Sequence, residues 1–156
     1  MTSLYQAMLS QTVAGQMLNM RDVSQFSAAE IRQTMADLVA ADRMDLASAL
    51  AAAGQSLYPE SEDILAISGL LAITREDWSL AVEILQDLVS VQNDRVQPMT
   101  YQMLARALAC NLDVAEAHQV LETALQKWPN DVTLIQERNA MATAVQDAMP
   151  APKLTN

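Results

Sequence analysis

The fold is decided by the stretch YQMLARALACNLDVAEAHQVLETALQKWP, which runs from Tyr101 to Pro129. Apolar residues recur in it at intervals of three and four, the spacing that places side chains on one face of a helix. The polar residues Asn111 to Asp113 interrupt this pattern and are typical of a tight turn. The stretch therefore predicts two short amphipathic helices joined by a turn and followed by a proline.

Two earlier segments of the chain repeat this unit. Placing Pro59 over Pro129 also places Ala47 over Ala117, and Ala81 stands 36 residues before Ala117. In the third unit the large, small and proline positions are Tyr101, Leu104, Ala105, Leu108, Ala117, Leu121, Ala124 and Pro129. In the second they are Leu65, Gly69, Ala72, Ala81, Leu85 and Leu88, and in the first Ile31, Leu38, Ala47, Ala51 and Pro59.

These spacings resemble the tetratricopeptide repeat (TPR) consensus over residues 28–131. The second unit departs from it at Ser68, where the family has Leu, and at Asn93, where it has Pro. The resemblance implies an all-α, TPR-like helical repeat: an N-terminal helix, about three helix-turn-helix units and a C-terminal capping helix. The alternatives are an ordinary alanine-rich helical bundle and chance spacing in a helix-rich sequence. The small residues at the repeat positions are expected to let paired helices approach closely.

Boundary signals divide the chain into three parts. Residues 1–26 are expected to form an amphipathic helix, residues 27–149 the repeat domain with its capping helix, and residues 150–156 a disordered tail. Ser27 and Glu30 form a capping-box pattern at the start of the first unit. Asn130 or Asp131 is expected to cap the final helix, and Gln92 to Pro98 form a lengthened loop.

Composition narrows the classes of partner. The net charge is −10, and Lys127 and Lys153 are the only lysines, so phosphate-rich partners such as nucleic acid or anionic membrane are disfavoured. The first twenty residues are not apolar enough for a signal peptide or a membrane span. One cysteine excludes an intramolecular disulfide and fits a reducing compartment. We expect a cytoplasmic protein that does not insert into membranes.

The N-terminal helix has two interpretations. Its first twenty residues contain no Asp, Glu, Lys or Arg, and its apolar residues recur at helical spacing. The helix either packs on the first repeat or forms a homo-oligomer or partner interface, and it can do both. The interface residues would be Leu4, Tyr5, Met8, Leu9, Val13 and Met17.

No pattern in the sequence predicts an enzyme, a metal site or a cofactor. Cys110 and His118 are the only cysteine and the only histidine, too few for a common zinc site. Cys110 is expected at the C-terminal end of a helix, where a thiolate is not stabilised. The carboxylates of Glu60, Glu62 and Asp63 precede a helix, whose N-terminus favours acidic residues.

The TPR resemblance implies a groove lined by the first helix of each unit. The groove positions are Arg32, Val39, Asp63, Ala66, Leu70, Ile73, Met99, Gln102 and Arg106. Ala36, Leu70 and Arg106 stand where the family's peptide clamp has Asn, so binding of chaperone tails is disfavoured. The groove is expected to be apolar, with Arg32 and Arg106 as separate positive charges.

The predicted function is therefore protein binding. We expect a chaperone or adaptor that holds an apolar or amphipathic segment of another protein in this groove. In its size, acidity and about three repeats, the chain also resembles the small TPR chaperones and apparatus proteins of bacterial type III secretion. The stretch LLAITREDWSLAVEIL, Leu70 to Leu85, resembles a segment of the apparatus proteins. The alternative function is a structural assembly subunit that oligomerises through its N-terminal helix.

Overall fold

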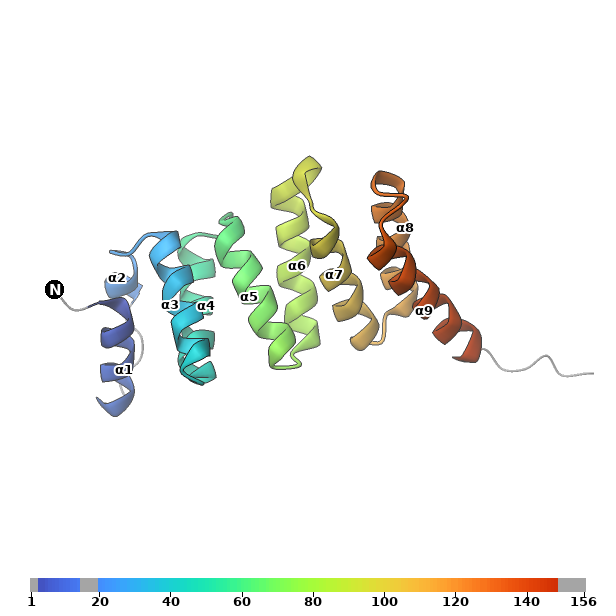
Figure 1. Cartoon of the computed structure of the whole chain (residues 1–156). Helices are drawn as coiled ribbons and strands as arrows, with labels where there is room; N and C mark the ends of the chain where they lie inside the picture. Colours follow the sequence, from blue (N-terminus) through green and yellow to red (C-terminus); the bar gives the residue numbers. More distant parts are fainter. Residues whose placement is uncertain (1–2, 15–19, 149–156) are drawn as a thin grey trace, which may run out of the picture. The chain divides into compact units, whose positions relative to one another are not determined.

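A computed structural model describes residues 3–14 and 20–148, except for the side chains of residues 11–14, 20, 21, 145 and 148. Within these ranges every regular element is helical (Figure 1), which confirms the all-α prediction. The elements are α1 Leu4–Ala14, α2 Met20–Val23, α3 Ala28–Ala40, α4 Met44–Leu57, α5 Glu62–Thr74, α6 Trp78–Gln92, the 3-10 helix η1 Asn93–Arg95, α7 Pro98–Cys110, α8 Val114–Lys127 and α9 Val132–Ala148.

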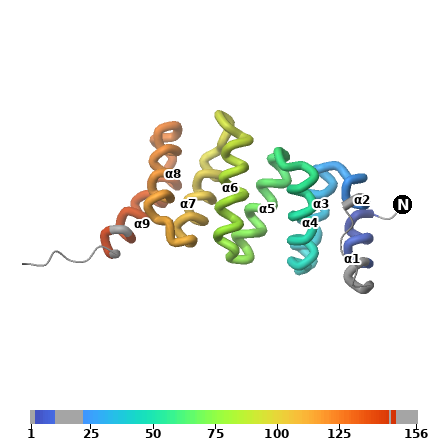
Figure 2. Tube along the Cα trace, turned by 180° about the vertical axis from the view of Figure 1, so that it is seen from behind, coloured from blue at the N-terminus to red at the C-terminus, as the bar shows by residue number. Residues whose placement is uncertain are grey.

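The chain separates into two compact units, Met1–Gln92 and Asn93–Asn156. In the first, α3 packs on α4 and α5, α4 also packs on α5, and α6 packs on α5. In the second, α8 packs on both α7 and α9. Figure 1 views α3 with α4 behind it and α9 with α8 behind it, and Figure 2 shows both pairs from the reverse side.

The turn within each helix pair has the same hydrogen bonds in all three pairs. Its second residue has a positive φ: 57° at Asp42, 58° at Glu76 and 68° at Leu112. The next N–H donates to the carbonyl five residues earlier, from Arg43 to Leu38 (2.8 Å), Asp77 to Ala72 (2.9 Å) and Asp113 to Leu108 (2.9 Å). This is the Schellman motif, which satisfies the last carbonyls of a helix. The tight turns that the sequence predicts are confirmed.

The turns that follow α4 and α8 have the same backbone conformation as each other. Tyr58 has φ −132° and ψ 65°, and Trp128 has φ −126° and ψ 69°.

Asp131, rather than Asn130, caps α9, because its carboxylate accepts the N–H of Leu134 at 3.0 Å. The predicted capping box at the start of α3 is confirmed: Ser27 Oγ accepts from the Glu30 N–H at 3.2 Å, and the Glu30 carboxylate accepts from the Ser27 N–H at 2.8 Å.

Burial follows the repeat positions. Ile31, Met35 and Leu38 of α3 are fully buried in the first unit, and so are Leu108 of α7 and Leu121 of α8 in the second. Each helix therefore contributes its apolar face to the core of its own unit, as the 3.6-residue period requires.

The single helix predicted for residues 1–26 stays a prediction, because the structure describes only residues 3–14 and 20–26 of this region. Two helices are described there, and the second ends at Val23, where the N–H of Phe26 donates to the carbonyl of Val23 at 3.0 Å. The predicted tail, residues 150–156, lies outside the described residues. The lengthened loop before Pro98 contains η1 and the buried Val96.

The close approach expected at the small repeat positions is confirmed at Gly69. A Cβ atom added to Gly69 would lie 2.9 Å from Cδ2 and 3.2 Å from Cγ of Leu85. Leu85 is fully buried, so it has little room to move away. The contact between α5 and α6 therefore depends on the absence of a side chain at this position.

Gly69→Ala is expected to destabilise the protein by about 1 kcal/mol, because overpacking costs about 1–3 kcal/mol and the helix propensity of Ala returns only about 1. Urea unfolding followed by circular dichroism measures this change. In a Leu85→Ala background the clash is absent, so the same substitution is expected to be neutral or stabilising. Equal effects in both backgrounds would show that Leu85 does not restrict the position.

Leu112→Gly is expected to stabilise the protein by about 0.5–1 kcal/mol, because a left-handed backbone conformation costs a non-glycine residue about 1–2 kcal/mol and the freer unfolded chain offsets part of the gain. The Leu112 side chain is 92% exposed, so little packing is lost. Leu112→Ala is the control, since it removes the same apolar side chain and keeps the strained backbone. Thermal unfolding of the two variants separates the effects, and equal melting temperatures would contradict the prediction.

Candidate protein-binding surfaces

An apolar pocket lies between α3 and α5 in the first unit. Its volume is about 200 Å³, and we call it the α3–α5 pocket. It is lined by Met35, Ala36, Val39, Ile67, Leu70, Leu71 and Thr74. The structure thus brings together Val39 and Leu70, two of the predicted groove residues.

Leu70 is the most distinctive residue of this pocket. Its side chain is 54% exposed, although it lies in the middle of a helix whose neighbouring residues Gly69 and Leu71 are buried. The hydroxyl of Thr74 donates to the carbonyl of Leu70 at 2.9 Å, so this polar group is satisfied within α5 and the pocket wall stays apolar. An exposed leucine beside an apolar depression is a feature of surfaces that bind other proteins.

Four further predicted residues lie on α3 and α5 but do not line this pocket. Arg32, Asp63 and Ala66 are exposed, and Ile73 is half-buried. Arg32 forms no ion pair with any described residue. The pocket therefore has an apolar floor and charged residues on the same two helices.

The other three predicted residues lie in the second unit. Met99 is 69% exposed. With Gln102 it lines a depression of about 320 Å³, whose other residues are Gln97, Pro98, Asp131, Thr133 and Leu134. The prediction of one continuous groove across both units stays a prediction.

Arg106 is not the separate charge that the sequence predicts. Its Nε lies 2.7 Å from Oε1 of Glu137 on α9, and its Nη2 also donates to that oxygen. Gln102 donates to the same carboxylate at 3.0 Å. The cause is the packing of α7 against α9. It brings Glu137 close to Arg106 and Gln102, which lie 31 and 35 residues before it in the sequence.

Glu137 is a residue that the sequence reasoning missed. When the repeats are aligned so that Pro59 corresponds to Pro129, Glu137 corresponds to Ile67, an apolar pocket residue of the first unit. A charge at an otherwise apolar repeat position is the signal that could have identified this residue.

Partial burial opposes ionisation of Glu137. The hydrogen bonds from Arg106 and Gln102 outweigh this effect of burial and lower the pKa of the carboxyl below its ordinary value.

The residues predicted as an oligomer interface lie mainly against the first unit. Leu4 and Met8 are 5% and 1% exposed within its core, and Tyr5 and Leu9 pack against that core half-buried. The packing interpretation of this helix therefore accounts for all four side chains. The Val13 side chain and Met17 lie outside the described residues, and the oligomer interface stays a prediction.

Cys110 and His118 do not form a site together. Cys110 is exposed at the C-terminal end of α7, while Nε2 of His118 lies 3.7 Å from Oε1 of Glu122 on α8. Over the described residues, no three His, Cys, Asp or Glu side chains gather in a way that could hold a metal ion. No described helix is long and apolar enough to cross a membrane.

Comparison with known proteins supports the repeat fold. No protein-family model matches the chain, and no curated protein matches it in sequence. Among solved structures, the first TPR domain of Spaghetti (RPAP3), bound to the HSP90 peptide SRMEEVD, matches with a TM-score of 0.66 and 15% identity. The match covers 76% of this chain and 93% of that one. The predicted TPR-like fold is confirmed, whereas the resemblance to type III secretion proteins stays a prediction.

Glu137→Gln is expected to destabilise the protein by about 1 kcal/mol near neutral pH, because the ion pair with Arg106 is lost. Since the folded-state pKa of Glu137 is lowered, its contribution is fully present above the ordinary value of about 4.3 and disappears as the pH falls through the folded-state pKa. Urea unfolding at a series of pH values measures the difference between the variant and the native protein.

The matched control is Glu83→Gln, which changes an exposed carboxylate on α6 that forms no ion pair with another described residue. We expect it to have little effect at any pH. A Glu137→Gln difference that stayed constant from neutral pH to strongly acidic pH would contradict a stabilising role for the carboxylate.

Proposed function

We propose that this protein is a protein-interaction module that binds an apolar segment of a partner through the face formed by α3 and α5. The observation that supports this proposal most directly is Leu70, which is 54% exposed at the edge of the α3–α5 pocket. A partner side chain that enters the pocket covers this leucine. Fully burying a leucine contributes about 1.5–3 kcal/mol, so even partial burial supplies a useful share of binding free energy.

The chemistry of this face favours a different ligand from that of the solved TPR neighbour. That domain is bound to the peptide SRMEEVD, which contains three acidic residues. Here the net charge is −10, and Ala36 and Leu70 occupy positions where a peptide clamp has Asn. An acidic tail would be repelled and would find few hydrogen-bond donors in the pocket. We therefore propose an apolar or amphipathic segment without a strong negative charge.

A cytoplasmic chaperone or adaptor is the cellular role that fits this binding mode. Covering an apolar segment keeps it from aggregating before it reaches its destination. Export of the partner by a type III secretion system is the specific setting that the sequence resemblance suggests. In the second unit Met99, 69% exposed, is a separate apolar residue with an adaptable side chain.

Leu70→Asp is expected to weaken partner binding about 10-fold or more, because a carboxylate at the pocket edge must be desolvated when the partner docks. Partners captured from native lysate are identified with the native protein, and their affinity for each variant is then measured by isothermal titration calorimetry. Met99→Asp tests the second unit in the same assay.

Leu112→Asp is the matched control, since Leu112 is also an exposed leucine but lies in the turn between α7 and α8. We expect it to bind as the native protein does. Circular dichroism establishes that each variant is folded. A folded Leu70→Asp variant with native affinity would overturn the assignment of this face.

A further inference from the structure

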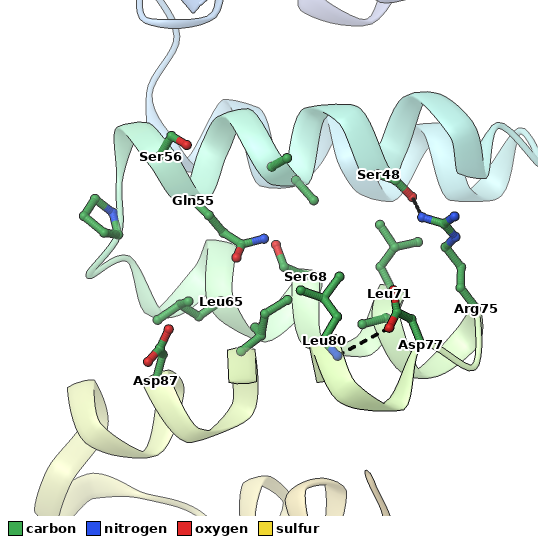
Figure 3. Close-up of a pocket in the computed structure, with 15 residues that line it drawn as sticks. Ser48, Gln55, Ser56, Leu65, Ser68, Leu71, Arg75, Asp77, Leu80 and Asp87 are labelled. Atoms are coloured by element: carbon green, nitrogen blue, oxygen red, sulfur yellow. Dashed lines mark hydrogen bonds between the residues drawn. The ribbon is translucent and has the colours of Figure 1, made fainter. Parts of the chain in front are cut away.

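A second groove lies on a different face of α5, between α4 and α6 (Figure 3). Its volume is about 420 Å³, and we call it the α4–α6 groove. The α3–α5 pocket is lined by Ile67, Leu70 and Thr74 of α5, whereas this groove is lined by Leu65, Ser68, Ala72 and Arg75. Leu71 borders both. The two depressions are therefore separate surfaces of one helix.

Ser68 forms part of the groove and has an unusual environment. The residue is 2% exposed, and its hydroxyl is the one buried side-chain polar group among the described residues without a hydrogen-bond partner. Thr34, Ser48 and Thr74, also within helices, donate to the carbonyl four residues earlier, at 2.7 to 2.9 Å. Leaving a buried hydroxyl without a hydrogen bond is unfavourable, because the group has lost its contact with water. A ligand that supplies the missing hydrogen bond removes this penalty.

Gln55 provides a second polar group beside Ser68. Figure 3 shows the Gln55 amide, from α4, and the Ser68 hydroxyl, from α5, pointing toward one another, although no hydrogen bond joins them. Gln55 is half-buried, so its amide can turn and admit a ligand group to the hydroxyl. Around these two groups the lining is aliphatic, with Leu65 and Ile84 buried and Leu80 40% exposed. A few convergent polar groups in an apolar cleft are typical of binding sites.

The two ends of the groove differ in charge. At one end Arg75 donates to Ser48 Oγ at 2.5 Å and stands beside Asp77, whose carboxylate accepts the Leu80 N–H at 3.4 Å. At the other end Asp87 is exposed and has no ion pair within the described part of the chain. The groove lining, with Arg75, Asp77 and Asp87, therefore has an excess of one negative charge, and Asp87 stands at the end away from Arg75, in a protein whose net charge is −10. This charge favours a cationic group at the Asp87 end.

We propose that the α4–α6 groove binds an amphipathic segment of a partner protein. The apolar side chains of the segment pack on Leu65, Leu80 and Ile84, and a Lys or Arg of the segment forms an ion pair with Asp87. A polar group of the segment takes the place of the Gln55 amide above Ser68. The site is independent of the α3–α5 pocket, so the protein can hold two segments at once, one on each face of α5.

The test uses two synthetic peptides of about 15 residues, long enough to form a helix on binding. One is an amphipathic peptide of Leu and Lys, and the other has Glu in place of every Lys. Each is titrated to about 1 mM into the ¹⁵N-labelled full chain, and amide shifts are mapped by NMR. We expect the Leu/Lys peptide to shift the amides of Ser68, Ile84 and Asp87, and the Leu/Glu peptide to leave them unchanged.

Variants locate the site. Asp87→Lys is expected to weaken binding of the Leu/Lys peptide about 5-fold or more. Asp94→Lys makes an equal charge change on η1 and is expected to change the affinity for this peptide less than twofold. Ser68→Leu, which installs the residue usual at this repeat position, is expected to raise the melting temperature and to block the peptide. Leu70→Asp leaves this binding unchanged, so failure here is distinguishable from failure at the α3–α5 pocket.

Three outcomes would overturn the proposal. The first is the absence of shifts around Ser68 at the highest peptide concentration. The second is equal weakening by Asp87→Lys and Asp94→Lys, which would show non-specific attraction to an acidic protein. The third is retained binding in a folded Ser68→Leu variant.

Discussion

The close contact between paired helices is the constraint on which the rest of the structure depends. Gly69 lies so near Leu85 that a single added carbon would come within 2.9 Å of its side chain. Ala81, Ala105 and Ala117 stand at the other small positions and are completely buried. Because these residues carry little or no side chain, the helices approach until the larger residues beside them fill the core. This packing also determines which faces of each unit point outward.

The packing makes α5 the central helix of the first unit. It contacts α3, α4 and α6, so most of its surface is covered, and the strips that remain become the α3–α5 pocket and the α4–α6 groove. Leu70 is exposed on one strip and Ser68 is buried at the other. A single 13-residue helix therefore presents two chemically different surfaces. The first is suited to an apolar side chain, and the second combines aliphatic walls with the unsatisfied hydroxyl of Ser68.

Polar residues at apolar repeat positions distinguish the two units. Glu137 takes the position of Ile67 and joins α9 to α7 through Arg106 and Gln102. Ser68 takes a position where the repeat has leucine and is left without a partner. The first substitution is compensated inside its own unit, whereas the second is not. This difference is why we associate Ser68 with a ligand and Glu137 with stability.

Sequence alone determined the helices, their turns and their caps, because these depend on residues three to five positions apart. The period of Leu104, Ala105 and Leu108, the capping box at Ser27 and the turn at Asn111 are all local signals. Only the tertiary structure decided that Arg106 is paired, that Met8 is buried and that the Ser68 hydroxyl is unsatisfied. Those facts depend on which helices meet and how closely, and contacts between residues on different helices leave no periodic pattern in the chain.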